Sequence, residues 1–258
     1  MKFEYKYIVP VSQLDELRTA ISPFVDVDPY AAGSPAHEYT VRSVYFDTHQ
    51  FDFYFEKVDG FKIRKKLRIR GYNDQKGDDI VFLEIKRKFK EPIEKNREKL
   101  DFETVKELLN ESGFTRSNGD GLGITQGING AARFLYHIYS QNLKPVVLVI
   151  YEREAYIDRF HQDMRLTIDK NLRSVPFPGI EDLFDESTAM PALEEKFIFE
   201  VKFHTNFPFW LRPVVGRLGL MRQAASKYVM CINNHRLADN ISRTMFFSHS
   251  TGQPQNNT

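Results

Sequence analysis

The chain has 258 residues, of which 41% are hydrophobic and 14% aromatic, which excludes a disordered protein and supports a packed core. Its 36 basic and 35 acidic residues leave a net charge of +1, which argues against a general nucleic-acid-binding surface and means that a positive site must come from clustering. The single cysteine, Cys231, excludes an internal disulfide and favours a reducing compartment. There is no apolar run of 18 residues and no signal-peptide pattern, so we expect no membrane span and a cytoplasmic location.

Residue spacing predicts the elements in chain order. Strand patterns occur at residues 3–9, 39–47, 61–72, 80–88, 145–158, 165–169 and 196–203. Helical spacing of apolar residues occurs at residues 14–22, 102–112, 131–141, 207–218 and 221–236. We expect the glycine-rich residues 117–130 to form a mobile loop and residues 241–258 to form a disordered tail. No linker or repeat divides the rest, so residues 1–240 are predicted to form one domain.

The hairpin predicted for residues 61–88 separates charged from apolar side chains most clearly. Because successive side chains of a strand point to opposite faces, one face carries Lys62, Arg64, Lys66, Arg68 and Arg70, and the other carries Ile63, Leu67 and Ile69. The second strand places Glu84, Lys86 and Lys88 opposite Val81, Leu83 and Ile85. Taken alone, such a charged row is usually a solvated face.

The charged rows recur in other strands. Glu4 and Lys6 share a face in the first strand, and Glu200 and Lys202 share a face near the end of the chain. The opposite rows are aromatic and β-branched, and several helices are available to cover them. We therefore predict an α+β fold in which a closed antiparallel β-barrel of about eight strands has a charged interior and is flanked by helices.

A charged interior of this kind has a specific chemistry. Carboxylates hold hard divalent cations through oxygen, and surplus arginine and lysine bind phosphate, arginine in a bidentate manner. Such an arrangement suits phosphoryl transfer, in which catalysis is mostly positioning and charge neutralisation. The seven histidines show no metal-ligand spacing, and no Ser-His-Asp motif occurs.

The strand motifs resemble the catalytic domain of the VTC-type polyphosphate polymerases, within the triphosphate tunnel metalloenzyme (CYTH-like) superfamily. The matching motifs are FEYKY at 3–7, RSVYFD at 42–47, KLRIRGY at 66–72, FLEIKRK at 82–88, YEREAY at 151–156, RLTID at 165–169, FEVKF at 199–203 and SKY at 226–228. Each motif alone is too short to identify a family. The resemblance rests on the order of the motifs and on their spread over nearly the whole chain. Ala224 departs from the family pattern, which can have a basic residue there, and Lys88 stands where the family can have histidine.

The resemblance implies a β-barrel tunnel that binds triphosphate or polyphosphate with Mg²⁺ or Mn²⁺. It assigns the catalytic contacts with phosphate to Arg68, Arg70, Lys86, Arg153 and Arg165, and the metal to Glu200. Further phosphate-binding positions are Glu4, Lys6, Arg42, Lys66, Lys88, Arg97, Lys99, Lys202, Ser226 and Lys227. The eukaryotic polymerases also carry a sensing domain and membrane helices, which we do not expect here.

Three functions remain open at this stage. The leading hypothesis is metal-dependent transfer of the terminal phosphoryl group of ATP to a polyphosphate chain. The second keeps the tunnel and hydrolyses triphosphate or polyphosphate instead. The third is a polyphosphate-binding module without catalysis. No pattern in the sequence indicates an oligomeric state.

Overall fold

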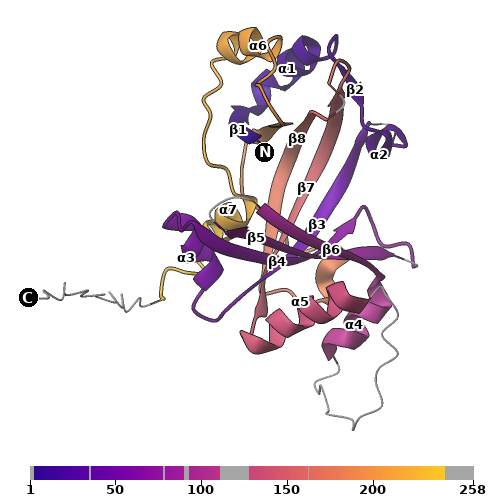
Figure 1. Ribbon diagram of the computed structural model, residues 1–258, viewed down its shortest axis with the longest axis vertical. Coiled ribbons are helices and arrows are strands. Elements are labelled where there is room, and N and C mark those ends of the chain that lie inside the picture. Colours follow the sequence, from indigo (N-terminus) through magenta and orange to yellow (C-terminus); the bar gives the residue numbers. More distant parts are fainter. Residues whose placement is uncertain are drawn as a thin grey trace, which may run out of the picture.

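The computed structural model describes residues 3–34, 36–77, 79–89, 93–110, 128–161 and 163–241. Most of the predicted glycine-rich loop, and the predicted tail from residue 242 onwards, lie outside these ranges. The predicted strands and helices are present, with differences at their ends (Figure 1). The structure adds elements that residue spacing did not predict, of which the strand Ile93–Asp101 is the longest.

The strands are β1 (Phe3–Pro10), β2 (Val25–Val27), β3 (Glu38–Asp47), β4 (Ile63–Tyr72), β5 (Ile80–Phe89), β6 (Ile93–Asp101), β7 (Lys144–Asp158), β8 (Arg165–Pro176), β9 (Met190–Pro191) and β10 (Lys196–Phe203). The helices are α1 (Leu14–Ile21), α2 (Pro29–Ala32), α3 (Asp52–Val58), α4 (Phe102–Asn110), α5 (Ile128–Ser140), α6 (Leu211–Arg217) and α7 (Lys227–Asn234). Two short 3₁₀ helices, η1 (Val11–Gln13) and η2 (Glu181–Phe184), complete the set.

The sheet is antiparallel and runs in the order β1-β10-β8-β7-β3-β4-β5-β6, with β2 paired to β7 and β9 to β8. The sheet is strongly curved. Its curvature brings Lys6 on β1 close enough to Lys66 of β4 and Lys86 of β5 to lower the pKa of both, although these strands are not neighbours in the sheet. The concave face is called the inner face below, and the convex face the outer face.

The predicted closed barrel is not confirmed. No backbone pairing joins β1 to β6 among the residues that the structure describes, so the sheet order is open. The free edge of β1 is met instead by the segment before α7: Tyr7 forms an isolated bridge with Arg222, and the N–H of Gln223 donates to the Lys6 carbonyl at 3.0 Å. These contacts occupy part of the edge at which a closing strand would have to pair, at Lys6 and Tyr7.

Two apolar clusters lie on the outer face. The first joins β3, β4, β5 and β7 to α4 and α5, through fully buried residues such as Leu67, Ile69 and Phe134. The second joins β1, β8 and β10 to α1 and α6, and includes Phe199, Leu211 and Trp210. In Figure 1, α4 and α5 lie below the β4–β6 strands, and α1 and α6 lie at the top of the molecule. The prediction that apolar rows face helices is confirmed.

Helix α7 lies on the inner face, unlike the other long helices. Its Tyr228, Cys231 and Ile232 pack against side chains from the inner face of β3 and β7, including Tyr45 and Tyr151. Cys231 is fully buried, and burial raises the pKa of its thiol to about 12. The helix therefore fills one part of the inner space and presents its N-terminus to the rest.

Asp47, at the end of β3, fixes both α3 and α7. Its carboxylate accepts from the N–H groups of Thr48 at 2.7 Å, Phe53 at 3.0 Å and Tyr54 at 2.9 Å, and from the hydroxyl of Tyr228 on α7. Burial raises the pKa of Asp47 to about 6, against the lowering effect of these donors. One buried carboxylate thus connects the sheet to two helices.

We expect Asp47→Ala to lower the free energy of unfolding by about 2–4 kcal/mol, because it leaves buried donors on α3 and α7 without an acceptor. Urea denaturation of the purified variant measures this. The matched control is Asp163→Ala at an exposed position, which should change stability by about 0.5 kcal/mol or less. An Asp47→Ala protein as stable as the control would contradict the role given to this carboxylate.

Candidate functional site

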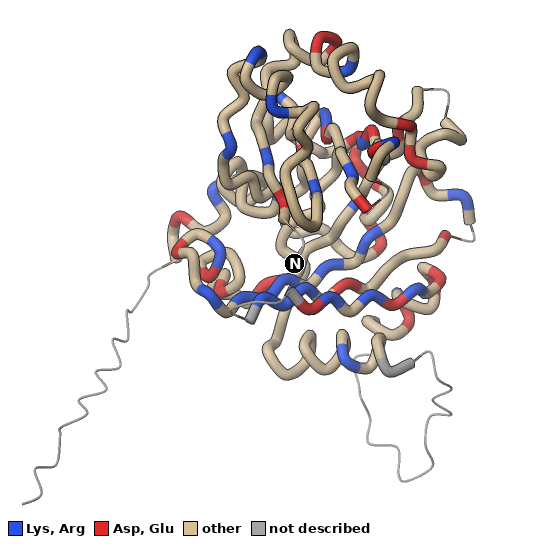
Figure 2. The backbone as a smooth tube through the Cα atoms, turned by 45° about the horizontal axis from the view of Figure 1, so that its top comes forward, with Lys and Arg blue, Asp and Glu red and all other residues tan. Residues whose placement is uncertain are grey.

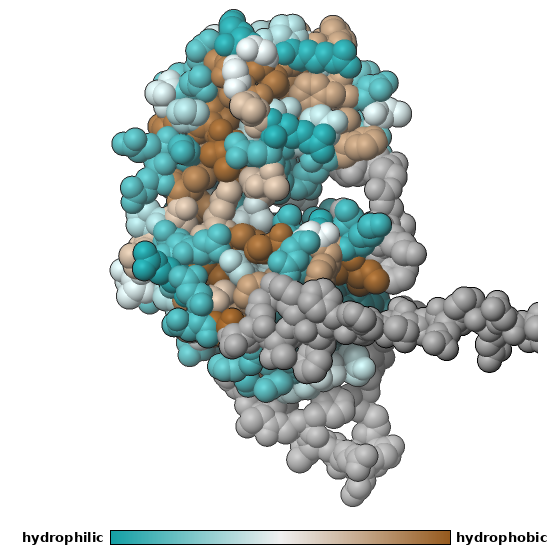
Figure 3. Space-filling model, turned by 90° about the vertical axis from the view of Figure 1, so that its left-hand side faces the viewer, coloured by the Kyte–Doolittle hydropathy of each residue, from teal (hydrophilic) through white to brown (hydrophobic). Residues whose placement is uncertain are grey.

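The inner face is charged. Strand register places Glu4 and Lys6 of β1 directly beside Lys202 and Glu200 of β10, and Arg68 of β4 beside Glu84 of β5. Figure 2 shows Lys and Arg positions concentrated along the strands in the lower half of the molecule, with acidic positions among them. Figure 3 shows the surface hollowed between the upper and lower parts, with hydrophilic side chains beside the hollow. Charged rows and apolar rows are therefore separated as the spacing predicted.

Three carboxylates, Glu84, Asp169 and Glu200, each lie between two cations; we call them the bridging carboxylates. Glu84 binds Arg68 at 2.6 Å and Arg97 at 3.3 Å. Asp169 receives two hydrogen bonds from Arg153, at 2.6 and 2.8 Å, and pairs with Lys227 at 2.5 Å. Glu200 pairs with Lys6 at 3.2 Å and with Lys202. The Glu84 and Asp169 groups each retain one net positive charge, whereas the Glu200 group is neutral because Lys6 also pairs with Glu4 at 2.8 Å.

The bridging carboxylates are ionised. Burial raises the pKa of Asp169, but Arg153 and Lys227 outweigh burial and bring it to about 2. Burial likewise opposes ionisation of Glu200, yet Lys202, Lys6 and Lys227 hold its pKa well below the ordinary value. Because Lys227 and Arg153 act on both carboxylates, the two groups form one electrostatic unit across β7, β8, β10 and α7.

Lys66, Arg70 and Lys86 also lie on the inner face, and none of the three has a carboxylate salt bridge within the described ranges. Arg70 donates to the Ser43 hydroxyl at 3.1 Å, and Lys66 donates to the Ser226 hydroxyl at 2.9 Å. Burial and then the charges of Lys6 and Lys86 hold the pKa of Lys66 well below its usual value. These cations supply the positive potential that an anionic ligand would meet.

The N-terminus of α7 enters this cationic region. Ser226 caps the helix by accepting from the N–H of Val229, and Lys227 is its first residue. The ammonium of Lys6 donates to the Ala225 carbonyl at 3.1 Å, which holds the same turn to β1. A helix N-terminus adds a favourable field for anions to the charges already present.

The remaining predicted residues lie further from this centre. Arg97 reaches Glu84 from β6 and stacks over Phe82 at 3.7 Å. Lys99 is exposed on β6, and Lys88 lies opposite Arg64 in the register of β5 and β4, near the start of β4. Arg165 is next to Lys202 in register, but its side chain is 52% exposed and pairs with Asp28 at 3.4 Å. These residues border the central cluster.

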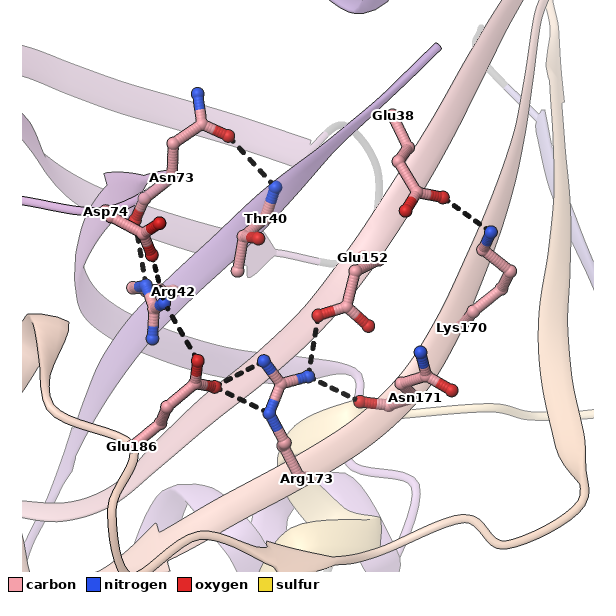
Figure 4. A network of polar contacts seen from close by, with 10 residues as sticks. All are labelled: Glu38, Thr40, Arg42, Asn73, Asp74, Glu152, Lys170, Asn171, Arg173 and Glu186. Carbon is pink, nitrogen blue, oxygen red and sulfur yellow. Dashed lines mark hydrogen bonds and ion pairs between the residues drawn. The ribbon is translucent and has the colours of Figure 1, made fainter. Parts of the chain in front are cut away.

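Arg42 is placed apart from the other predicted phosphate-binding residues. Its side chain lies on the outer face, donates to the Asn73 carbonyl at 2.8 Å, and pairs with Asp74 at 2.9 Å and Glu186 at 3.2 Å (Figure 4). Glu186 in turn pairs with Arg173, which also binds Glu152. The odd positions of β3 face inward, so Ser43 and Tyr45, and not Arg42, reach the central cluster. The structure thus does not bring Arg42 into the site.

Several residues of the site were not singled out from the sequence. Glu84 and Asp169 are bridging carboxylates, and Tyr45 accepts from Arg68 at 2.7 Å. The signal for both carboxylates was present, because Glu84 alternates with Lys86 and Asp169 alternates with Arg165. Tyr45 lies in an aromatic stretch, which gave no reason to separate it from the core.

Glu200 and Glu4 are the carboxylates that could hold a divalent cation, once the cation displaces the ammonium groups of Lys6 and Lys202 that contact both oxygens of Glu200. The carboxylate of Glu4 is close enough for Lys6 to bridge the two, at 2.8 Å to Glu4 and 3.2 Å to Glu200. No group of three or more His, Cys, Asp or Glu side chains suited to a metal occurs in the described part of the chain. This donor set fits Mg²⁺ or Mn²⁺, since Mg²⁺ is usually held by one or two carboxylates together with water and phosphate oxygens.

Comparison with known proteins identifies the domain. The family model of the VTC domain matches residues 1–235 of this chain. The chain belongs to the VTC domain family. This VTC domain is 23% identical to the vacuolar transporter chaperone complex subunit 4 of Schizosaccharomyces pombe, over 82% of this chain and 34% of that protein. The chain therefore spans about a third of the length of that relative.

Two solved structures also resemble the VTC domain. One is the PH1819 protein from Pyrococcus horikoshii OT3, with 15% identity, 92% of this chain and 100% of that chain covered, and a TM-score of 0.45. The other is a putative adenylyl cyclase from Hippeastrum, HpAC1, described as having a dominant triphosphatase activity, with 16% identity, coverage of 91% and 96%, and a TM-score of 0.43. None of the helices in the described ranges is long and apolar enough to cross a bilayer.

The inner face predicts a pH-dependent affinity for anions. Burial, opposed by Glu4 and supported by Lys95 and Lys6, lowers the pKa of Lys86 to about 8. Lys86 is therefore charged at pH 7 and loses its charge as the pH rises through about 8. We expect the affinity for tripolyphosphate to fall roughly threefold to tenfold between pH 7 and pH 9, measured by calorimetry.

Lys86→Arg is the control for this measurement, because arginine keeps its charge over the same range. The affinity of Lys86→Arg for tripolyphosphate should change less between pH 7 and pH 9 than that of the wild type. Tripolyphosphate itself titrates in the same way in both measurements, so a difference between the two pH profiles comes from residue 86. Identical pH profiles for the two proteins would contradict a titrating Lys86.

Proposed function

We propose that this VTC domain transfers the terminal phosphoryl group of ATP to the end of a polyphosphate chain on its inner face, with Mg²⁺ or Mn²⁺ as cofactor. One observation carries the proposal: cations from β1, β4, β5, β7, β10 and α7 converge on one face and exceed the carboxylates among them. A polyanion would supply the missing negative charge. The family relationship supports a phosphate-chemistry role for this face.

The proposed reaction needs no nucleophile from the protein. A terminal oxygen of the chain forms a bond to the γ-phosphorus of ATP while the bond to the β-phosphate oxygen breaks, and ADP leaves. Arg68, Arg70 and Lys86 are proposed to hold the phosphates from β4 and β5, and Arg153 from β7. Arg165 is proposed to act at the exposed border. These groups offset charge that develops on the transferred phosphoryl group.

Glu200, with Glu4 beside it, is proposed to hold the divalent cation, which would supply positive charge that offsets the charge of the substrate phosphates. Lys6 and Lys202 keep Glu200 ionised and ready to act as a ligand. Ser226 and Lys227 are proposed to contact the phosphate chain from the N-terminus of α7. A cytoplasmic location and a single domain over residues 1–240 stay predictions.

The direct test is incubation of the full chain with ATP and Mn²⁺, followed by staining for polyphosphate and measurement of ADP and free phosphate. We expect polymer and ADP in the wild type. Glu200→Gln should reduce polymer formation by at least about 100-fold, because it removes the charge of the proposed metal ligand. Free phosphate without polymer would instead indicate a hydrolase, and tripolyphosphate binding without turnover would indicate a binding module.

Arg68→Ala tests the phosphate contacts separately. It removes a charge-assisted contact and leaves Glu84 paired only with Arg97, so we expect the affinity for tripolyphosphate to fall by about 1–3 kcal/mol. Calorimetry at one salt concentration measures this. Arg133→Ala, on the surface of α5, is the matched control and should bind like the wild type. Equal affinity in Arg68→Ala and the control would mean that the row on β4 is a solvated face.

A further inference from the structure

Four buried side-chain nitrogen or oxygen atoms have no hydrogen-bond partner among the described residues: Arg42 Nη1, Arg87 Nε, Glu152 Oε2 and Thr167 Oγ1. The first three belong to groups whose other atoms are bonded, to Asp74, His137 and Arg173 respectively. All three side chains lie on the outer face. Thr167 is different, because its hydroxyl is its only polar side-chain atom.

Thr167 lies at the centre of the proposed site. On β8 it pairs in register with Glu200 of β10 on one side and with Ala155 of β7 on the other. Two positions away, on the same face, are Arg165 and the bridging carboxylate Asp169. Thr167 is only 6% exposed, so water has little access to its hydroxyl. A buried donor that has no partner in the described ranges is therefore held beside the proposed metal ligand.

Such a hydroxyl is costly to keep in the folded protein. Burying a polar group without a hydrogen bond costs free energy, whereas valine has the same shape and carries no such cost. Valine also suits a β-strand as well as threonine does. Strand propensity and packing alone therefore favour valine at this position, and the hydroxyl requires a partner that the described part of the protein does not provide.

We propose that the Thr167 hydroxyl is a ligand contact, which donates a hydrogen bond to an oxygen bound to the divalent cation at Glu200. That oxygen belongs either to a phosphate group of the substrate or to water in the shell of the cation. The inference rests on the metal and phosphate binding of the proposed function. Thr167 thus completes on β8 the site that Glu200 and Glu4 begin on β10 and β1.

The test compares tripolyphosphate binding in the presence of Mn²⁺ and in the presence of EDTA, by calorimetry on the full chain. Thr167→Val removes the hydroxyl and keeps the shape, and Thr167→Ser keeps the hydroxyl. Thr40→Val makes the same change on the outer face of β3, as Figure 4 shows, and is the matched control. Thermal unfolding of each variant checks the fold, and Thr167→Ala replaces Thr167→Val should the latter not fold.

We expect Thr167→Val to weaken Mn²⁺-dependent binding about fivefold to twentyfold, the range for losing one hydrogen bond to a charged partner. Thr167→Ser and Thr40→Val should stay within about twofold of the wild type, and binding in EDTA should be unchanged in every variant. The thermal unfolding temperature of Thr167→Val should equal or exceed that of the wild type, because a buried hydroxyl without a partner is removed. A Thr167→Val protein that binds with Mn²⁺ as the wild type does would overturn the inference.

The two proposals fail in different ways. A wild-type protein that binds tripolyphosphate with Mn²⁺ but makes no polymer removes the proposed transferase reaction and leaves the role of Thr167 standing. Unchanged binding in Thr167→Val overturns the contact and leaves the reaction standing. Binding that shows no dependence on Mn²⁺ in the wild type overturns both, because the cation at Glu200 is common to them.

Discussion

The sharing of each inner carboxylate between two cations is the interaction on which this structure depends. Buried charges are strongly unfavourable unless they are paired, and unpaired cations on a concave face would repel one another. Glu84, Asp169 and Glu200 each join cations from different elements, so they hold β1, β4, β6, β7, β10 and α7 around one space. Pairing therefore offsets the buried charges of the fold. The groups around Glu84 and Asp169, together with Lys66 and Arg70, still leave positive charge for a ligand.

The position of the helices follows from that inner face. With charge on the concave side, the apolar rows of the same strands must be buried on the convex side, and α1, α4, α5 and α6 cover them. Helix α7 is the exception, because its apolar side packs on inner-face tyrosines while its N-terminus carries Ser226 and Lys227. Asp47 and Tyr228 fix this helix, and so a buried hydrogen bond outside the site sets the position of two of its residues.

The open edge of the sheet is linked to the same helix. The segment that leads into α7 bonds to the backbone of β1, and the Lys6 side chain returns to the Ala225 carbonyl. Lys6 also pairs with Glu4 and Glu200. The edge strand, the proposed metal ligands and the N-terminus of α7 are therefore one connected unit. A movement of α7 would therefore shift Lys6, and with it the ion pair between Lys6 and Glu200.

The period-two spacing of the sequence alone determined which face of β1, β4, β5 and β10 is charged, because strand geometry leaves no other arrangement. The same alternation contained Glu84 and Asp169, although their role as shared carboxylates depends on residues far away in the chain. Only the tertiary structure decided that Arg42 faces outward and that β1 bonds to residues 222 and 223 and not to β6. It also decided that Thr167 lies beside Glu200 with no hydrogen-bond partner for its hydroxyl among the described residues. These features depend on curvature and on contacts between distant segments, which a local pattern of residues does not encode.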